Sequence, residues 1–411
     1  MLMTTKKIIG QIHLWLGLAS GLVVVILGIT GCLYAFIDEL EPIVYKQHVV
    51  IEQRAFTPLP LPVHFLKASA QQAIGAEYPI TRFEIPGAAD RTYKFSASKR
   101  DEKAKTYFGE IIYSYSAYVN PYTGKVLKVE NGKYEFFNLV VALHYDLFLH
   151  KLGKQIVGWS TIIFIVLLIS GIVLWWPKNK AAAKQRFWFR WKDTTQWKRK
   201  NYDLHNIFGF YTMILALIIA LTGLVWAFPW FNDSVQFLAN GGKTTEKPKP
   251  TLSDTTLLSS KSNLDHIISQ VRAEVPVANY YFINLPREKK STLSVSASGI
   301  GSERYRFTSY QFDQYTGTLL KKDTFKNKNT GQQLRSMNYD IHVGSILGLP
   351  GKILAFLASF VAAGLPVTGF YIWLGRKKKK KKKKDKSTTT SLKASTNKPK
   401  KTKIKFDKVA M

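Results

Sequence analysis

The sequence predicts an integral membrane protein: a four-transmembrane-helix bundle, produced by a parallel internal duplication, that carries two α+β modules outside the membrane. Four segments are apolar over at least the length of about 20 residues that a bilayer requires. They cover roughly residues 8–36, 156–176, 204–228 and 353–374. The first and third segments share residues at one fixed offset, and the second and fourth share residues at another. Two copies of a helix–module–helix unit explain both observations.

The distribution of basic residues predicts the orientation of these helices. Lys6 and Lys7 precede the first apolar segment, nine Lys and Arg residues lie in loop 178–202, and Arg376 and the lysine run 377–384 follow the fourth segment. The positive-inside rule places such residues in the cytoplasm. Both termini and the short loop are therefore expected in the cytoplasm, and the connections 38–137 and 231–335 outside.

The expected division of the chain follows from these segments. It comprises transmembrane helix 1 (1–37), external module 1 (38–137), an interfacial segment with transmembrane helix 2 (138–177), a basic cytoplasmic loop (178–202), transmembrane helix 3 (203–230), external module 2 (231–335), an interfacial segment with transmembrane helix 4 (336–375), and a disordered polybasic cytoplasmic tail (376–411).

Composition excludes several classes of function. The 411 residues include 59 Lys+Arg against 27 Asp+Glu, a formal net charge of +32, and a single cysteine. One cysteine excludes intramolecular disulfides, cysteine-ligated zinc or iron–sulfur centres and covalent haem attachment. Neither a phosphate-binding loop nor a dinucleotide fingerprint is present. Because the basic loop and tail adjoin membrane helices, their expected partner is anionic lipid and not nucleic acid.

Four of the eight histidines obey the repeat. His13 and His205 are 192 residues apart, and His144 and His342 are 198 apart. A histidine in or beside a membrane helix is costly and is by default a functional residue, although a hydrogen-bonded interfacial histidine is the alternative. The nearby basic residues place His13 and His205 at the cytoplasmic face. His144 lies 31 residues before Trp175, too far to be inside the membrane, so this histidine and His342 belong at the external face.

The expected ligand of these pairs is haem. Two imidazoles without a clear carboxylate or cysteine partner are too few for most metal sites, whereas haem accepts two axial histidines. Gly17 and Gly209 each follow a histidine by four residues and lie on its helical face. Small residues form stripes on both helices, for which close helix packing is an equally good explanation. The stripes comprise Gly10, Gly17, Gly21 and Gly28 on the first helix and Gly209, Ala216, Ala220 and Ala227 on the third.

The external modules are expected to be α+β. Residues 91–98 and 112–119 alternate as half-buried strands do, and residues 264–275 form a helical pattern before a strand at 280–284. Tyr113, Tyr115, Tyr118, Tyr305 and Tyr310 are expected to be exposed. Sheet packing explains these tyrosines as well as a ligand surface does, so none is assigned a site.

The repeated motifs resemble the PepSY-associated transmembrane family. They comprise His13-x-Trp15-x-Gly17, Thr30-Gly31, Leu204-His205 with Gly209, Thr222-Gly223, His144 with Gly153 and Gly171, and Trp175-Trp176-Pro177. The turns 120–124 and 313–317 resemble the Asp-x-x-Thr-Gly hairpin of PepSY modules, with Asn120 in place of Asp in the first.

This resemblance implies an iron-regulated protein of the bacterial inner membrane. Some family members resemble ferric-siderophore reductases that hold haem between their helices, and His13, His205, His144 and His342 are the positions that match the ligands. The modules are then periplasmic PepSY-like domains, a domain type also linked to peptidase inhibition.

The resulting functional hypothesis is an oxidoreductase with two b-type haems and no catalytic amino acid. Electrons from a quinol or a cytoplasmic reductase cross the membrane to a periplasmic ferric siderophore or other iron chelate, which releases iron(II). The alternative is a non-enzymatic PepSY-type regulatory or binding protein that engages an envelope partner. A permease for chelated iron is disfavoured because the helices lack a broken segment and a central acidic residue.

Overall fold

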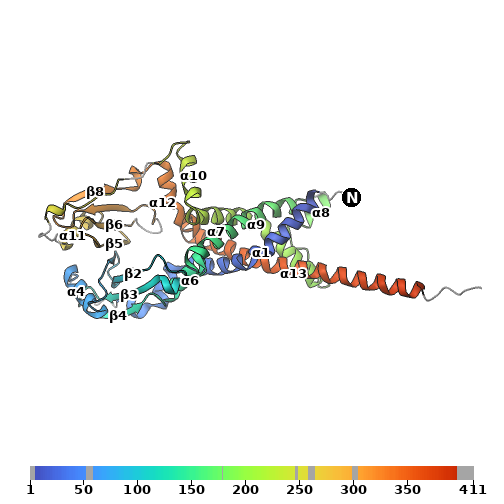
Figure 1. The fold of residues 1–411 in the computed structure, drawn as a ribbon, viewed down its shortest axis with the longest axis horizontal. Helices are drawn as coiled ribbons and strands as arrows, with labels where there is room; N and C mark the ends of the chain where they lie inside the picture. Colours follow the sequence, from blue (N-terminus) through green and yellow to red (C-terminus); the bar gives the residue numbers. More distant parts are fainter. Residues whose placement is uncertain are drawn as a thin grey trace, which may run out of the picture.

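The computed structural model describes residues 5–51, 59–177, 179–245, 249–257, 264–298 and 304–395. Within them the long helices α1 (Thr5–Tyr34), α7 (His150–Trp175), α9 (Trp197–Ala227) and α13 (Gly348–Ser395) form one elongated bundle, and the strands gather at one end of it (Figure 1). Helix α1 contacts α7 and α13, and α9 contacts the same two helices, so the four helices close into a ring. All four contain a stretch long and apolar enough to cross a membrane, as the sequence predicted.

The C-terminal segment corrects one expectation. Residues 376–411 were expected to be disordered, but α13 continues without a break to Ser395. Lysine is a good helix former, and a helix that has already formed in the membrane elongates without a new nucleation cost. Residues 396–411 lie outside the described part of the chain.

Short helices line the end of the bundle that carries the strands. Helix α6 (Phe136–Asp146) precedes α7, and α12 (Thr330–His342) precedes α13. Leu147, Phe148 and His150 adopt positive φ values between α6 and the first turn of α7, so the chain bends there and does not run on as one helix. The remaining short helices are found in several parts of the chain. They are α2 (Ile37–Val44), α3 (Lys46–Val49), α5 (Tyr107–Glu110), α8 (Lys180–Lys184), α10 (Pro229–Ala239), η1 (Thr255–Leu257), η2 (Phe325–Asn327) and η3 (Ser345–Leu347).

The strands form a single eight-stranded antiparallel sheet in the order β4-β3-β2-β1-β5-β6-β7-β8. The strands are β1 (Arg82–Pro86), β2 (Tyr93–Arg100), β3 (Ile111–Val119), β4 (Val126–Asn131), β5 (Tyr280–Asn284), β6 (Leu293–Ala297), β7 (Thr308–Phe312) and β8 (Leu319–Asp323). Each half of the chain supplies four consecutive strands, and pairing of β1 with β5 joins them. The sequence led us to expect two modules, but it did not predict that their sheets are continuous.

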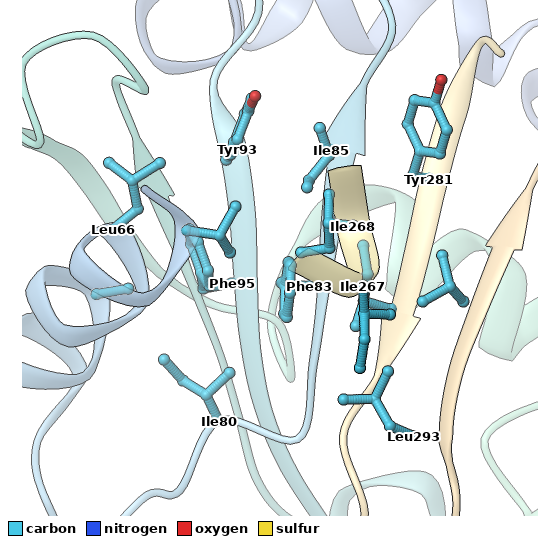
Figure 2. Close-up of a cluster of buried hydrophobic side chains, with 14 of the residues drawn as sticks. Leu66, Ile80, Phe83, Ile85, Tyr93, Phe95, Ile267, Ile268, Tyr281 and Leu293 are labelled. Atoms are coloured by element: carbon cyan, nitrogen blue, oxygen red, sulfur yellow. The ribbon is translucent and has the colours of Figure 1, made fainter. Parts of the chain in front are cut away.

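The sheet is apolar on one face and polar on the other. On the apolar face, side chains from both halves pack with α4 (Val63–Ile74) and α11 (Leu264–Glu274) into one core, in which Phe83, Phe95 and Ile283 are fully buried (Figure 2). Alternate residues, such as Glu84 and Lys94, face the other way and line a cavity beside the bundle. This alternation follows from the two-residue period of a strand.

Equivalent turns close a hairpin in each half. Asn120 Oδ1 accepts a hydrogen bond of 2.9 Å from the backbone N–H of Tyr122, and Asp313 Oδ1 accepts one of 2.9 Å from that of Tyr315. The amide oxygen of Asn120 therefore accepts the same hydrogen bond as the carboxylate of Asp313 in the second turn. Gly124 and Gly317 both have φ = 73°, a conformation that favours glycine.

The shared core gives a stability prediction. Replacing Phe83, which is 0% exposed, with Ala should lower the free energy of unfolding by about 3–5 kcal/mol, because the change leaves a cavity between the two halves. The matched control is Phe282→Ala on the neighbouring strand, where the side chain is 39% exposed on the polar face. Thermal unfolding of the purified chain in detergent measures both, and equal effects would contradict the shared core.

Candidate functional site

His13 and His205 line one cavity inside the bundle. The cavity has a volume of about 470 Å³ and lies among α1, α7, α9 and α13. His13 comes from α1 and His205 from α9, which face each other across the ring of helices. Gly10, Gly17 and Gly209 also line the cavity, so part of the glycine stripe provides space and does not serve helix packing alone.

His144 and His342 line a second cavity at the end of the bundle near the sheet. Its volume is about 490 Å³. His144 lies on α6 and His342 on α12, and their ring centroids are 6.2 Å apart with the ring planes at 75°. Burial lowers the pKa of His144 to about 4 and that of His342 to about 3, so both imidazoles are neutral at pH 7. A neutral imidazole is the form that binds a metal.

Each of the four rings is held by the same kind of contact. The Nδ1 atom lies 2.9 Å from the hydroxyl oxygen of a serine or threonine on another helix. The pairs are His13 with Ser170, His144 with Thr30, His205 with Thr368 and His342 with Thr222. Because this contact occupies Nδ1, Nε2 is the ring nitrogen left for a ligand.

A glycine follows each of these hydroxyl residues and lies against the same ring. A methyl group added to the glycine would lie 3.4 to 3.5 Å from the histidine Cε1, so a side chain larger than alanine would displace the ring. The glycines are Gly171 beside His13, Gly31 beside His144, Gly369 beside His205 and Gly223 beside His342. We call each Ser/Thr-Gly dipeptide with its histidine a hydroxyl–glycine clip.

The sequence reasoning missed half of these contacts. Thr30-Gly31 and Thr222-Gly223 were recognised as repeated motifs, but no role was assigned to the hydroxyl groups. Ser170 and Thr368 were overlooked, although they are 198 residues apart and precede Gly171 and Gly369. The available signal was a hydroxyl–glycine dipeptide in every one of the four apolar segments.

Both cavities carry positive charge at their rims. Lys6, Lys7 and Arg376 line the first cavity, and Lys154 and Arg335 line the second. Among the described residues, neither lining includes an aspartate or a glutamate. The remaining lining is mainly apolar. Each cavity therefore suits a ligand with a flat or bulky apolar body and acidic groups at one edge.

The two cavities are separated by a thin wall. Val24 and Phe164 line both of them, and within the described chain no other residue does. Further along α1, a Cβ on Gly28 would lie 2.7 Å from the Cβ of Ala363, so α1 and α13 approach closely there. The small-residue stripe thus serves both of its expected roles: space around the histidines and close packing of helices.

A third cavity, which we call the chamber, lies between the polar face of the sheet and the end of the bundle. Its volume is about 770 Å³. Tyr34 lines both the chamber and the cavity of His144 and His342, so the two adjoin. Tyr118, expected to be exposed, is 3% exposed and lines the chamber; Tyr305 and Tyr310 are likewise buried, because they pack within module 2.

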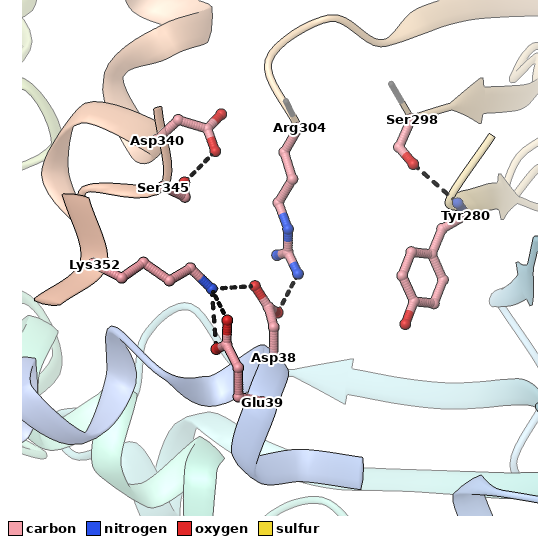
Figure 3. A network of polar contacts seen from close by, with 8 residues as sticks. All are labelled: Asp38, Glu39, Tyr280, Ser298, Arg304, Asp340, Ser345 and Lys352. Atoms are coloured by element: carbon pink, nitrogen blue, oxygen red, sulfur yellow. Dashed lines mark hydrogen bonds and ion pairs between the residues drawn. The ribbon is translucent and has the colours of Figure 1, made fainter. Parts of the chain in front are cut away.

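Ion pairs connect the bundle and module 2 at the edge of the chamber (Figure 3). The Lys352 Nζ atom lies 3.2 Å from Asp38 and 2.9 Å from Glu39, and Arg304 of the second half pairs with Asp38. Lys352 is only 5% exposed. Because Asp38 and Glu39 directly follow α1, this network fixes the end of α1 to the start of α13.

A separate cluster joins the elements next to His144. The Nδ1 atom of His150 lies 2.8 Å from Glu110, which also pairs with Arg100 at 3.0 Å. Asp146 lies close enough to complete a group of three possible metal ligands. The arginine and the histidine already balance Glu110, so an ion-pair network accounts for the arrangement.

Comparison with known proteins identifies the family. The chain matches the PepSY-associated TM region family over residues 11–376 and belongs to that family. It is accordingly a membrane protein. None of the curated proteins compared with the chain matches it.

The ion-pair network gives a second prediction. Lys352→Met should lower the free energy of unfolding by about 1–2 kcal/mol, because it removes the cation of Glu39 and leaves Asp38 with Arg304 alone. Lys322→Met, which removes a pair whose side chains are each 41% exposed, is the control and should cost no more than about 1 kcal/mol. Thermal unfolding in detergent compares the two; a wild-type melting temperature for Lys352→Met would show that the network adds nothing to stability.

Proposed function

We propose that this protein is a haem-containing membrane reductase that carries electrons across the membrane to a ferric chelate on the external side and releases iron(II). The single observation that carries the proposal is the convergence of four histidines into two cavities, each lined by one pair. A b-type haem in each cavity would supply reversible one-electron chemistry.

The spacing of the outer histidines supports axial ligation. His144 and His342 have ring centroids 6.2 Å apart. Their Nε2 atoms would hold one metal between them, since a metal–imidazole bond is about 2 Å long.

The linings of the cavities fit the rest of a haem. Volumes of about 470 and 490 Å³ fall in the usual range of about 300–1,000 Å³ for small-molecule sites. Apolar side chains and glycines would contact the macrocycle. The rim cations Lys154 and Arg335 in one cavity, and Lys6, Lys7 and Arg376 in the other, would pair with the two propionates.

The two histidine pairs are suited to the transfer of electrons from one membrane face to the other. On α1, His13 and Thr30, the hydroxyl partner of His144, are 17 residues apart, which corresponds to about 25 Å along a helix. We infer, with the basic residues, that His13 and His205 lie at the cytoplasmic side and that the sheet is periplasmic. The element order of the halves supports an internal duplication as the origin of both pairs. A quinol or a cytoplasmic reductase would supply each electron.

The chamber is the proposed site of the iron substrate. It adjoins the outer histidine cavity at Tyr34 and has room for a chelate at about 770 Å³. One electron converts the bound iron(III) to iron(II), and oxygen chelators hold iron(II) much more weakly. The chain's own contribution is to hold the chelate beside the outer site; no proton-transfer residue is required.

Haem binding tests the proposal directly. The wild-type chain, purified in detergent with haem supplied, should contain two haems and show a Soret band that sharpens on addition of dithionite. His13→Ala or His205→Ala should remove one haem, and His144→Ala or His342→Ala the other, because each change deletes an axial ligand. His64→Ala is the control, since His64 pairs with Asp265 on the surface.

Two results would contradict this assignment. Equal loss of both haems from any single substitution would overturn the two-site arrangement. A colourless wild-type preparation would overturn the reductase and favour a regulatory or binding protein.

A substitution in the chamber tests the place of the substrate. Ser296→Trp should lower kcat/KM for reduction of a ferric chelate by about tenfold or more, because the indole fills space on the polar face of the sheet. The haem spectrum should not change. Ser294→Trp lies two residues away on the same face but does not line the chamber, and it should reduce chelate at the wild-type rate; equal rates for both variants would place the substrate elsewhere.

A further inference from the structure

The three threonine hydroxyls that contact histidines each donate a hydrogen bond to a backbone carbonyl of their own helix. Thr30 Oγ1 donates to the carbonyl of Ile26 at 2.7 Å, Thr222 Oγ1 to that of Ile218 at 2.8 Å, and Thr368 Oγ1 to that of Gly364 at 2.9 Å. A hydroxyl has one proton, so toward the histidine its oxygen acts only as an acceptor. The histidine must then donate from Nδ1.

This direction fixes the tautomer of the imidazole. A neutral ring has a single N–H, so a proton on Nδ1 leaves Nε2 with a free lone pair. Each of the three threonine hydroxyls also lies within hydrogen-bond distance of a second backbone carbonyl, three residues earlier: of Leu27 at 3.2 Å, of Leu365 at 3.0 Å and of Ile219 at 2.9 Å. A carbonyl only accepts hydrogen bonds, which favours the same proton position.

Ser170 differs from the three threonines. Its Oγ donates at 3.3 Å to the carbonyl of Leu167, three residues earlier, whereas each threonine donates at 2.7–2.9 Å to the carbonyl four residues earlier. Serine lacks the second branch that restricts χ1 in threonine, so its hydroxyl rotates more easily.

We propose that the four hydroxyl–glycine clips are positioning elements that hold each histidine as the Nδ1-protonated tautomer with Nε2 directed into its cavity, and that His13 is the most weakly held of the four. The inference rests on the proposed haem function. An Nδ1–H that donates to an oxygen makes the imidazole a stronger electron donor to a bound metal. Each clip therefore stabilises the ferric state of its own haem, the clip of His13 least.

Valine substitutions test the clips because valine keeps the shape of threonine and removes the hydroxyl. Thr30→Val, Thr222→Val and Thr368→Val should each weaken haem binding at one cavity by about 10–100-fold. Each should also raise the midpoint potential of that haem alone. Thr212→Val is the matched control: Thr212 lies on α9 and donates to the carbonyl of Phe208 at 2.8 Å, as the threonines of the clips donate to a carbonyl four residues earlier, but it lines neither histidine cavity.

Exchange of serine and threonine provides a test that does not risk misfolding. Ser170→Thr should strengthen haem binding at the inner cavity and lower the midpoint potential of that haem, and Thr368→Ser should do the reverse. Potentiometric titration followed in the Soret band measures both quantities in the full-length chain. A purely structural role would change the melting temperature without changing the potential.

The outcomes separate this inference from the proposed function. If the wild-type chain binds two haems but the valine variants match Thr212→Val in affinity and potential, the clips are not positioning elements and the reductase proposal stands. If Ser170→Thr changes neither the affinity nor the midpoint potential of the inner haem, His13 is not the most weakly held of the four histidines. If the wild-type chain binds no haem, both proposals fail.

Discussion

Four half-buried imidazoles near or within an apolar bundle are the constraint on which the rest of the structure depends. A buried polar ring requires a hydrogen-bond partner, and here each partner comes from a different helix. The contact of His13 ties α1 to α7, and that of His205 ties α9 to α13. Interhelical hydrogen bonds in membranes contribute only about 0.6 kcal/mol each on average. Four of them add little to stability, so their main effect is to orient the rings.

The positions of the rings determine where space is left between the helices. Glycines beside the rings allow the imidazoles to lie against neighbouring helices, and the same glycines line the two cavities. At the level of the outer cavity, Gly28 and Ala363 let α1 and α13 approach closely. Val24 and Phe164 line both cavities and separate them.

The eight-stranded sheet extends this arrangement beyond the end of the bundle. Its apolar face is covered by α4 and α11, which leaves the polar face to border the chamber. Continuity of the sheet through β1 and β5 means that residues of both halves meet there: Lys94 from the first half and Tyr280 from the second line the same chamber. A molecule held in the chamber would therefore contact both halves of the chain at once.

Sequence patterns predicted much of this fold and singled out the four histidines that the structure brings together in pairs. The helices were found because about 20 apolar residues are required to cross a bilayer, and strand β5 and helix α11 because their periodicities are unambiguous. The four histidines were recognised because they form two pairs, each separated by the same number of residues as the apolar segments beside it. Chance alone rarely produces such an agreement. The helical continuation of α13 to Ser395 was missed, since a lysine-rich composition gives no apolar face by which to recognise a helix.

The sequence by itself determined which residues recur: the apolar spans, the paired histidines and the Thr-Gly and Ser-Gly dipeptides that accompany them. Only the tertiary structure decided which hydroxyl meets which histidine, because each contact joins helices more than 100 residues apart in the chain. The tertiary structure also decided that β1 pairs with β5. It likewise distinguishes two lysines at equivalent positions of the repeat: Lys154 lines a histidine cavity, whereas Lys352 forms ion pairs with Asp38 and Glu39. Spacing along the chain encodes local periodicity, whereas these contacts depend on how separate elements pack in three dimensions.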